Sequence, residues 1–167
     1  MSRKSALDWK PRLKRTLKRK IGTRFFEAAD ARIFFGAYKL GAFGGLPSGL
    51  DAGDFKAAVG MLIERSMGLW VIEADRPIGA VFGAAGSEAH HLWVEPVWFP
   101  WATPRQRLEG ALRFILDNKN EFLIMAAFRQ DDKRFAEHLS RYGVMTRIAK
   151  VPKWFGEEDG MLFRSIK

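Results

Sequence analysis

The sequence predicts a single α+β domain preceded by a cationic arm. Two observations carry this prediction: strand-length apolar runs alternate with segments of helical periodicity, and almost all of the excess positive charge lies in the first 24 residues. A chain of 167 residues, 47% of them hydrophobic, is long enough to bury one core. The absence of cysteine excludes a disulfide scaffold and a thiol nucleophile, and with only three histidines we expect no metal site.

The arm spans residues 1–24 and carries ten basic side chains against one acidic one, whereas residues 25–167 are neutral overall. We therefore expect attraction to an acidic partner to reside in the arm, and we expect the domain to use no apolar residue before Phe25. Leu13, Leu17 and Ile21 would form an apolar stripe on a basic helix, which could bind a protein surface, nucleic-acid phosphates or anionic lipid. The alternative is that the arm is a solvated tail. The predicted partner-binding residues of the arm are Arg12, Leu13, Lys14, Arg15, Leu17, Lys18, Arg19 and Lys20.

The first half of the domain is predicted to contain one strand, two helices and three strands. Two phenylalanines mark a short strand at 23–28, and Asp30 and Asp51 are suitable N-caps for the two helices. The glycine-rich segment 41–49 separates these helices as a loop. The three strands are predicted at 68–73, 77–85 and 90–97.

The second half is predicted to contain a helix, a strand, a helix and two strands. Thr103 and Gln106 form a capping box, and Pro104 suits the first helical position, so the first helix begins there. The dense apolar run 122–128 is typical of a central strand, and Gly143 marks the end of the next helix. The remaining elements are a helix from Asp131 and strands at 144–151 and 160–165, linked by a turn-rich segment at 152–159.

This order resembles the GNAT fold of a family of N-acetyltransferases over about residues 24–167. Leu92-Trp93-Val94-Glu95-Pro96 resembles the family's fourth strand, and residues 132–144, ending Tyr142-Gly143-Val144, resemble its fourth helix. The resemblance implies a mixed, mainly antiparallel sheet flanked by helices, in the order β-α-α-β-β-β-α-β-α-β-β. It also implies that strands 90–97 and 122–128 lie side by side and splay apart at Val97. Residues 98–105 resemble GNAT-related proteins of tailed phages, some of which are virion components.

The loop after the fourth strand departs from the family's pattern. GNAT enzymes hold the pyrophosphate of CoA on backbone N–H groups of a Gln/Arg-x-x-Gly-x-Gly/Ala loop. Aligned on that pattern, this sequence has Phe99 at the Gln/Arg position, Ala102 at the first glycine and Pro104, which has no N–H, at the last small residue. The candidate cofactor-binding residues, if the site is active, are Ala102, Thr103, Arg105, Gln106 and Arg107, with the two arginines holding phosphate by side chain.

The catalytic positions implied by the resemblance are also incomplete. Glu95 is the candidate base, and a solvent-facing strand acid is the alternative interpretation. The tyrosine that protonates the thiolate in many GNAT enzymes falls at Leu139, and the asparagine that opens the helix falls at Asp132. Tyr142 is a poor substitute and is predicted to pack in the core.

These departures favour a GNAT-fold structural or assembly protein, a phage virion component with a degenerate acyl-CoA site and no cofactor. Its expected partners are other virion or assembly proteins or further copies of itself. Trp98 and Trp101 are expected to contact these partners together with the arm. Binding of nucleic acid by the arm is a further alternative. The expected location is the virion or host cytoplasm, without secretion or a membrane span, since Ser-Arg-Lys-Ser follows Met1. The alternative is an active acyl-CoA-dependent N-acyltransferase that uses acetyl-CoA and an atypical pyrophosphate loop.

Overall fold

The computed structural model of the chain describes residues 21–166, and the predicted partner-binding residues between Arg12 and Lys20 lie outside this part. The described residues form a seven-stranded sheet in the order β1-β2-β3-β4-β5-β7-β6. Its strands are β1 (Gly22–Phe25), β2 (Gly68–Glu73), β3 (Pro77–Ala85), β4 (His91–Trp98), β5 (Leu123–Phe128), β6 (Met145–Phe155) and β7 (Glu158–Ser165). The helices are α2 (Ala31–Lys39), α3 (Ala52–Arg65), α4 (Pro104–Asn118) and α5 (Lys133–Arg141), with 3₁₀ turns η1 (Ala28–Asp30) and η2 (Gln130–Asp132).

The predicted α+β class and element order are confirmed. All neighbouring strands are antiparallel except β4 and β5, which pair in parallel from His91↔Leu123 to Val94↔Ala126. The two strands separate after Val94, three residues before the predicted position. Pro96 has no N–H to give a neighbouring strand, whereas pairing of β3 with β4 continues to Trp98.

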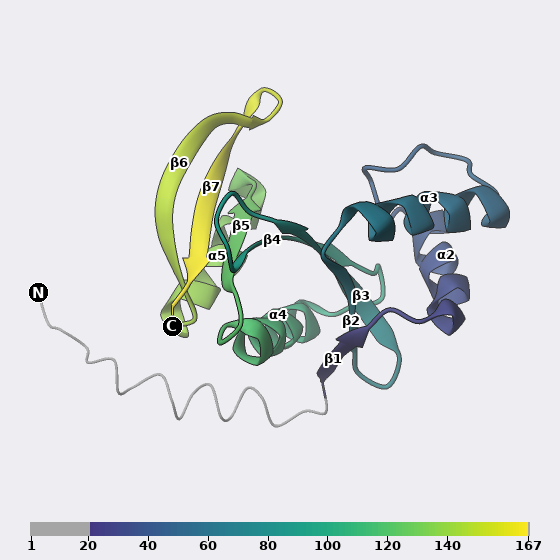
Figure 1. Ribbon diagram of the computed structural model, residues 1–167, viewed down its shortest axis with the longest axis horizontal. Helices are drawn as coiled ribbons and strands as arrows, with labels where there is room; N and C mark the ends of the chain where they lie inside the picture. Colours follow the sequence, from purple (N-terminus) through teal and green to yellow (C-terminus); the bar gives the residue numbers. More distant parts are fainter. Residues whose placement is uncertain (1–20, 167) are drawn as a thin grey trace, which may run out of the picture.

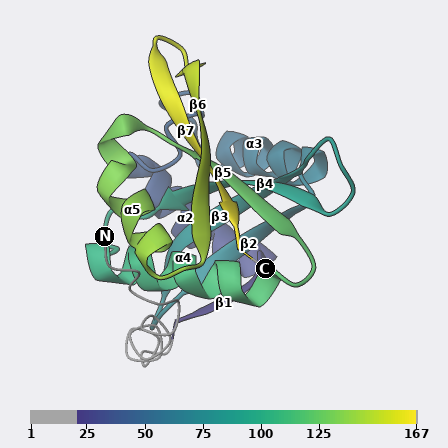
Figure 2. The ribbon, with the colours of Figure 1, turned by 90° about the vertical axis from the view of Figure 1, so that its left-hand side faces the viewer.

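Two helical layers cover opposite faces of the sheet (Figures 1 and 2). On one face, α2 and α3 bury an apolar cluster with β2 to β4, which includes the fully buried Phe34 and Phe99. On the other face, α4 and α5 bury a larger cluster that includes Leu112, Ile124 and Leu139. The hairpin of β6 and β7 extends beyond both layers (Figure 1).

This hairpin is more regular than the sequence predicts. The sequence predicts a turn-rich link at 152–159, but β6 and β7 continue through most of it and the connection is short, closed by the pair Phe155↔Glu158. Gly156 has a φ of 73°, a conformation that glycine adopts without strain. A register shift between Val151 and Phe155 accommodates Pro152 within the strand.

The folded unit begins earlier than the boundary drawn after Arg24. Ile21 is 6% exposed and belongs to the larger apolar cluster, so the expectation that the domain uses no apolar residue before Phe25 is wrong. Residues 22–24 lie in β1, where they pair with β2. The spacing of Leu13, Leu17 and Ile21 fits an apolar stripe on a separate helix. From the sequence alone, this spacing does not show that Ile21 instead packs in the core of the domain.

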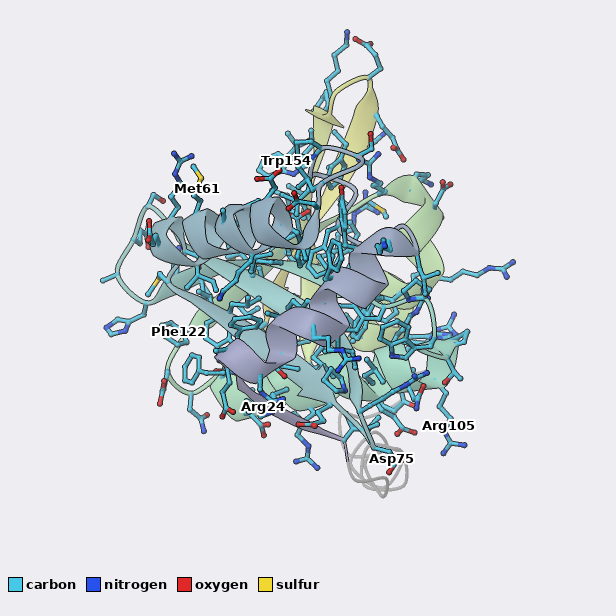
Figure 3. All side chains as sticks on the ribbon, turned by 90° about the vertical axis from the view of Figure 1, so that its right-hand side faces the viewer. Arg24, Met61, Asp75, Arg105, Phe122 and Trp154 are labelled. Carbon is cyan, nitrogen blue, oxygen red and sulfur yellow. The ribbon has the colours of Figure 1, made fainter. Side chains whose placement is uncertain are left out.

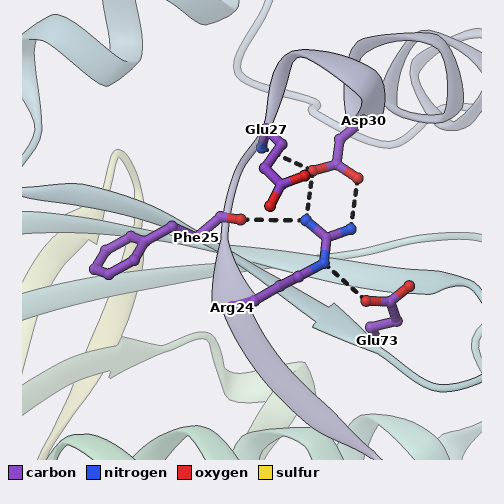
Figure 4. Close-up of polar contacts among 5 residues, drawn as sticks. All are labelled: Arg24, Phe25, Glu27, Asp30 and Glu73. Carbon is purple, nitrogen blue, oxygen red and sulfur yellow. Dashed lines mark hydrogen bonds and ion pairs between the residues drawn. The ribbon is translucent and has the colours of Figure 1, made fainter.

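Arg24 ties β1 to two neighbouring elements (Figure 4). Its guanidinium donates two hydrogen bonds of 2.7 Å to the carboxylate of Asp30 and one of 2.8 Å to Glu73. The Asp30 carboxylate, 6% exposed, also accepts a hydrogen bond from the backbone N–H of Glu27. The Arg24 guanidinium therefore holds the pKa of Asp30 below its usual value.

Candidate functional site

A pocket of about 260 Å³ opens where β4 and β5 separate. Pro96 and Trp98 line it from β4, and Phe128 lines it from the end of β5. The aromatic ring of Phe135 on α5 lies 6.2 Å from that of Trp98 and 6.0 Å from that of Phe128. The pocket therefore has apolar walls, and its remaining lining residues are Pro104, Arg107 and Asp132.

The first turn of α4 forms one side of the pocket, and its capping box is confirmed. The backbone N–H of Gln106 donates to Thr103 Oγ1 at 3.2 Å, and the N–H of Thr103 donates to Gln106 Oε1 at 2.9 Å. These bonds use backbone donors at the helix start that would otherwise be available to an anion.

The same segment does not provide a backbone cradle for a pyrophosphate. The N–H of Ala102 bonds to the carbonyl of Phe99, the N–H of Arg107 bonds to the carbonyl of Thr103, and Pro104 has no N–H. Phe99, at the family's Gln/Arg position, is buried among α2 and α3 on the other face of the sheet. Phosphates at this helix start would therefore be held by side chains.

Arg107 is the cation that faces the pocket. Its Nε donates to the carbonyl of Ala102 at 3.2 Å, and this bond leaves the terminal nitrogens of the guanidinium for other acceptors. Arg105, predicted beside it, is not among the lining residues, and its Nε forms an ion pair of 2.8 Å with Glu109. The structure thus separates the two arginines that the sequence grouped together.

Asp132 is a pocket carboxylate that the sequence did not single out as a site residue. It ends η2 and precedes α5, and its side chain makes no capping bond among the described residues. Partial burial and the neighbouring carboxylates of Asp131 and Glu158 raise its pKa, against the charges of Arg129 and Arg107. The alignment of Asp132 with the family's helix-opening asparagine could have marked it as a site residue. Its proximity to Arg107, however, is visible only in the folded structure.

Of the remaining predicted residues, Glu95 and Trp101 are not among the pocket's lining residues, whereas Trp98 is. Glu95 is exposed, and because strand side chains alternate it points away from Pro96 and Trp98, to the opposite face of β4. Trp101 is half-buried, donates its indole N–H to the carbonyl of Pro77 and stacks under the guanidinium of Arg76. It therefore packs inside the fold, and Trp98 forms a pocket wall.

The two residues considered for the family's tyrosine, Leu139 and Tyr142, both pack against the larger apolar cluster. Leu139, at the family's tyrosine position, is 1% exposed in the larger apolar cluster. Tyr142 packs half-buried against the same cluster. Residues 21–166 contain no group of three or more side chains able to hold a metal ion, and none of their helices is long and apolar enough to cross a membrane.

Several solved structures that share this arrangement are described as acetyltransferases. A probable acetyltransferase of the GNAT family from Chromobacterium violaceum matches with a TM-score of 0.69 and 15% identity over 87% of each chain. The chain has the GNAT fold. A chimera of the Vibrio cholerae spermidine N-acetyltransferase SpeG with hSSAT matches with a TM-score of 0.67 and 12% identity, covering 88% of this chain and 95% of that one. A ribosomal-protein-alanine N-acetyltransferase from Brucella melitensis matches with a TM-score of 0.64 and 10% identity, covering 87% and 99%. No family model matches the chain, and no curated protein matches its sequence.

Proposed function

We propose that this GNAT-fold protein is an acyl-CoA-dependent N-acyltransferase. The observation that carries the proposal is the pocket at the separation of β4 and β5, which has apolar walls and holds a cation and a carboxylate. Apolar walls suit a thioester and its aliphatic linker, and a cation at the rim suits phosphates. The acetyltransferases that share the fold support the same assignment.

Phosphate binding in this proposal depends on side chains. Arg107 lines the pocket and is the main contact, while Arg105 lies two residues nearer the helix start and is 61% exposed. Ala102, Thr103 and Gln106 shape the helix start, and their backbone N–H groups are bonded within it or to the preceding loop. We therefore expect weaker binding of CoA than a backbone cradle would give.

Two carboxylates divide the proton transfers between the two sides of β4. Acyl-CoA supplies the acyl group when bound, and transfer to an amine releases one proton from nitrogen and requires one at sulfur. Glu95 is the candidate base, and because it lies on the face of β4 away from the pocket, it can take the proton only from an amine that approaches the acyl group from that face. Asp132 lines the pocket, and burial raises its pKa, which is the direction of shift that a proton donor to sulfur needs.

The decisive experiment is titration calorimetry of the full chain with acetyl-CoA. We expect binding that Arg107→Ala weakens by about tenfold, as for loss of one charge-assisted contact. Arg113→Ala is the matched control, because Arg113 lies on the same helix and pairs with Asp117 outside the pocket. Turnover is then measured with spermidine and with a peptide that begins with alanine. No heat at millimolar acetyl-CoA would refute the proposal.

The occupied N–H groups favour a second candidate, a structural or assembly protein with a degenerate site. Thr103 and Gln106 bond each other at the position where an enzyme of this fold would bind pyrophosphate. The acetyltransferases that share the fold lend no support to a role in a phage particle. Absence of acetyl-CoA binding together with self-association or capture of an acidic partner would favour this candidate.

A further inference from the structure

A smaller cavity lies directly behind the pocket, between α4, α5 and the sheet. Its volume is about 30 Å³, and all of its lining residues are hydrophobic. Four residues line both the cavity and the pocket, namely Pro96, Trp98, Phe128 and Phe135. The cavity therefore continues the apolar walls of the pocket into the core.

The positions of the lining residues give the direction in which the cavity extends. The pocket reaches only the first turn of α4 and the last residue of β5. The cavity is lined by Ala111, one turn further along α4, and by Ile124 and Ala126, which lie earlier in β5. Figure 3 shows Arg105, near the start of α4, and Phe122, just before β5, on opposite sides of the molecule. The cavity thus extends inward, away from the arginine-bearing start of α4.

The hydrophobic lining decides what this cavity can hold. A buried water needs a space of about 10–15 Å³ and at least two polar partners. The cavity has room for about two groups of that size, but its lining residues are all hydrophobic. Apolar cavities of this kind stay dry and take apolar groups. Two methylenes of an aliphatic chain therefore match the cavity in both size and chemistry.

We propose that the cavity receives the end of an acyl chain about two carbons longer than acetyl, so that butyryl-CoA is the preferred donor. The inference rests on the proposed function, because it assigns the acyl group of the donor that occupies the same pocket. With the phosphates held near Arg107 at the start of α4, the acyl end points away from that helix start and toward the cavity. An acetyl group leaves the cavity empty, whereas the two further methylenes of butyryl fill it.

Titration calorimetry of the full chain with CoA, acetyl-CoA, butyryl-CoA and octanoyl-CoA tests this preference. Burial of each methylene raises affinity about fourfold, so butyryl-CoA should bind about tenfold more tightly than acetyl-CoA. Octanoyl-CoA should bind no more tightly than butyryl-CoA, because a cavity of about 30 Å³ has no room for its four further carbons.

Two variants test whether the chain end lies in the cavity. Ala111→Val adds two carbons from α4 to the same space, so the preference for butyryl-CoA over acetyl-CoA should fall from about tenfold to within about twofold. Ala57→Val is the matched control and should keep the full preference. Ala57 is exposed on α3, which packs on the opposite face of the sheet, and the same substitution there has a similar cost in helix propensity. If Ala111→Val does not fold, Ile115→Val decides, because it enlarges the cavity by one methyl and should move the tightest binding from butyryl-CoA to pentanoyl-CoA.

Three results would overturn this inference and leave the proposed function intact. The first is equal affinity for acetyl-CoA and butyryl-CoA, which would make the cavity a mere gap in packing. The second is an affinity that rises steadily up to octanoyl-CoA, which would show nonspecific apolar contact. The third is a tenfold preference that persists in Ala111→Val, which would place the chain end elsewhere. If none of the four ligands binds, the proposed function fails and this inference fails with it.

Discussion

Replacing Arg24 by Gln should destabilise the protein by leaving Asp30 buried without its main partner. Asp30 is 6% exposed and would keep only its hydrogen bond from the Glu27 backbone, after losing two bonds of 2.7 Å. Removing one partner of a fully buried ion pair costs about 3–5 kcal/mol. Arg24 itself is 33% exposed, so solvent screening reduces the expected loss to about 2–3 kcal/mol.

The assay is urea unfolding at pH 7 and pH 3, followed by tryptophan fluorescence. Since the folded state lowers the pKa of Asp30, the ion pair contributes stability above the unfolded pKa of about 4 and loses it as pH falls through the lower folded value. The difference between wild type and variant should therefore shrink at pH 3. Arg113→Gln, which breaks an exposed pair with Asp117, should cost about 0.5 kcal/mol or less.

A loss equal to that of the Arg113 control, or one independent of pH, would refute the reasoning. The first result would show that water solvates Asp30 when Arg24 is absent. The second would show that Arg24 acts through packing rather than through its charge.

Three further predictions concern the core and the pocket. Ile21→Ala should cost about 3 kcal/mol in urea unfolding, because Ile21 is a core residue, and an equal stability of chains starting at residues 21 and 25 would contradict this. Gly110→Ala should cost about 1–3 kcal/mol by the same measurement, since the new methyl would lie 2.6 Å from Ile72 Cγ2; unchanged stability would mean that α4 shifts freely. Asp132 has a raised pKa, so the folded state binds more protons and wild-type stability should fall, relative to Asp132→Asn, as pH rises from 4 to 7. A rise of this relative stability between pH 4 and 7 would show that folding lowers the pKa of Asp132 instead of raising it.

The local sequence determined most elements because their signals are short-range. The capping box of Thr103 and Gln106 set the start of α4, and the apolar run 122–128 marked β5. Both depend on neighbours within a few residues, through helix-capping bonds and through the burial of a strand on both faces. The order of these elements, together with the resemblance of residues 92–96 and 132–144 to a known family, predicted the fold.

The candidate site was only partly predictable. The sequence analysis named Arg107 as a candidate phosphate-binding residue. That prediction depended on the family's pyrophosphate-loop pattern, which this chain does not follow. Asp132 lies 25 positions further along and meets Arg107 only because β4 and β5 separate after Val94. Such a meeting depends on strand pairing between distant segments, for which a single sequence carries no direct signal.

The sequence by itself determined the element order and the concentration of positive charge before the domain. The tertiary structure alone decided where the domain begins, because Ile21 is a core residue only when β1 pairs with β2 and packs near α4. It also decided which carboxylates are buried: in the sequence Glu109 looks like an ordinary helix acid and Asp30 like a helix N-cap, and long-range packing buries both. Burial arises from contacts between segments far apart in the chain, whereas helix caps and apolar periodicity arise from contacts within a few residues.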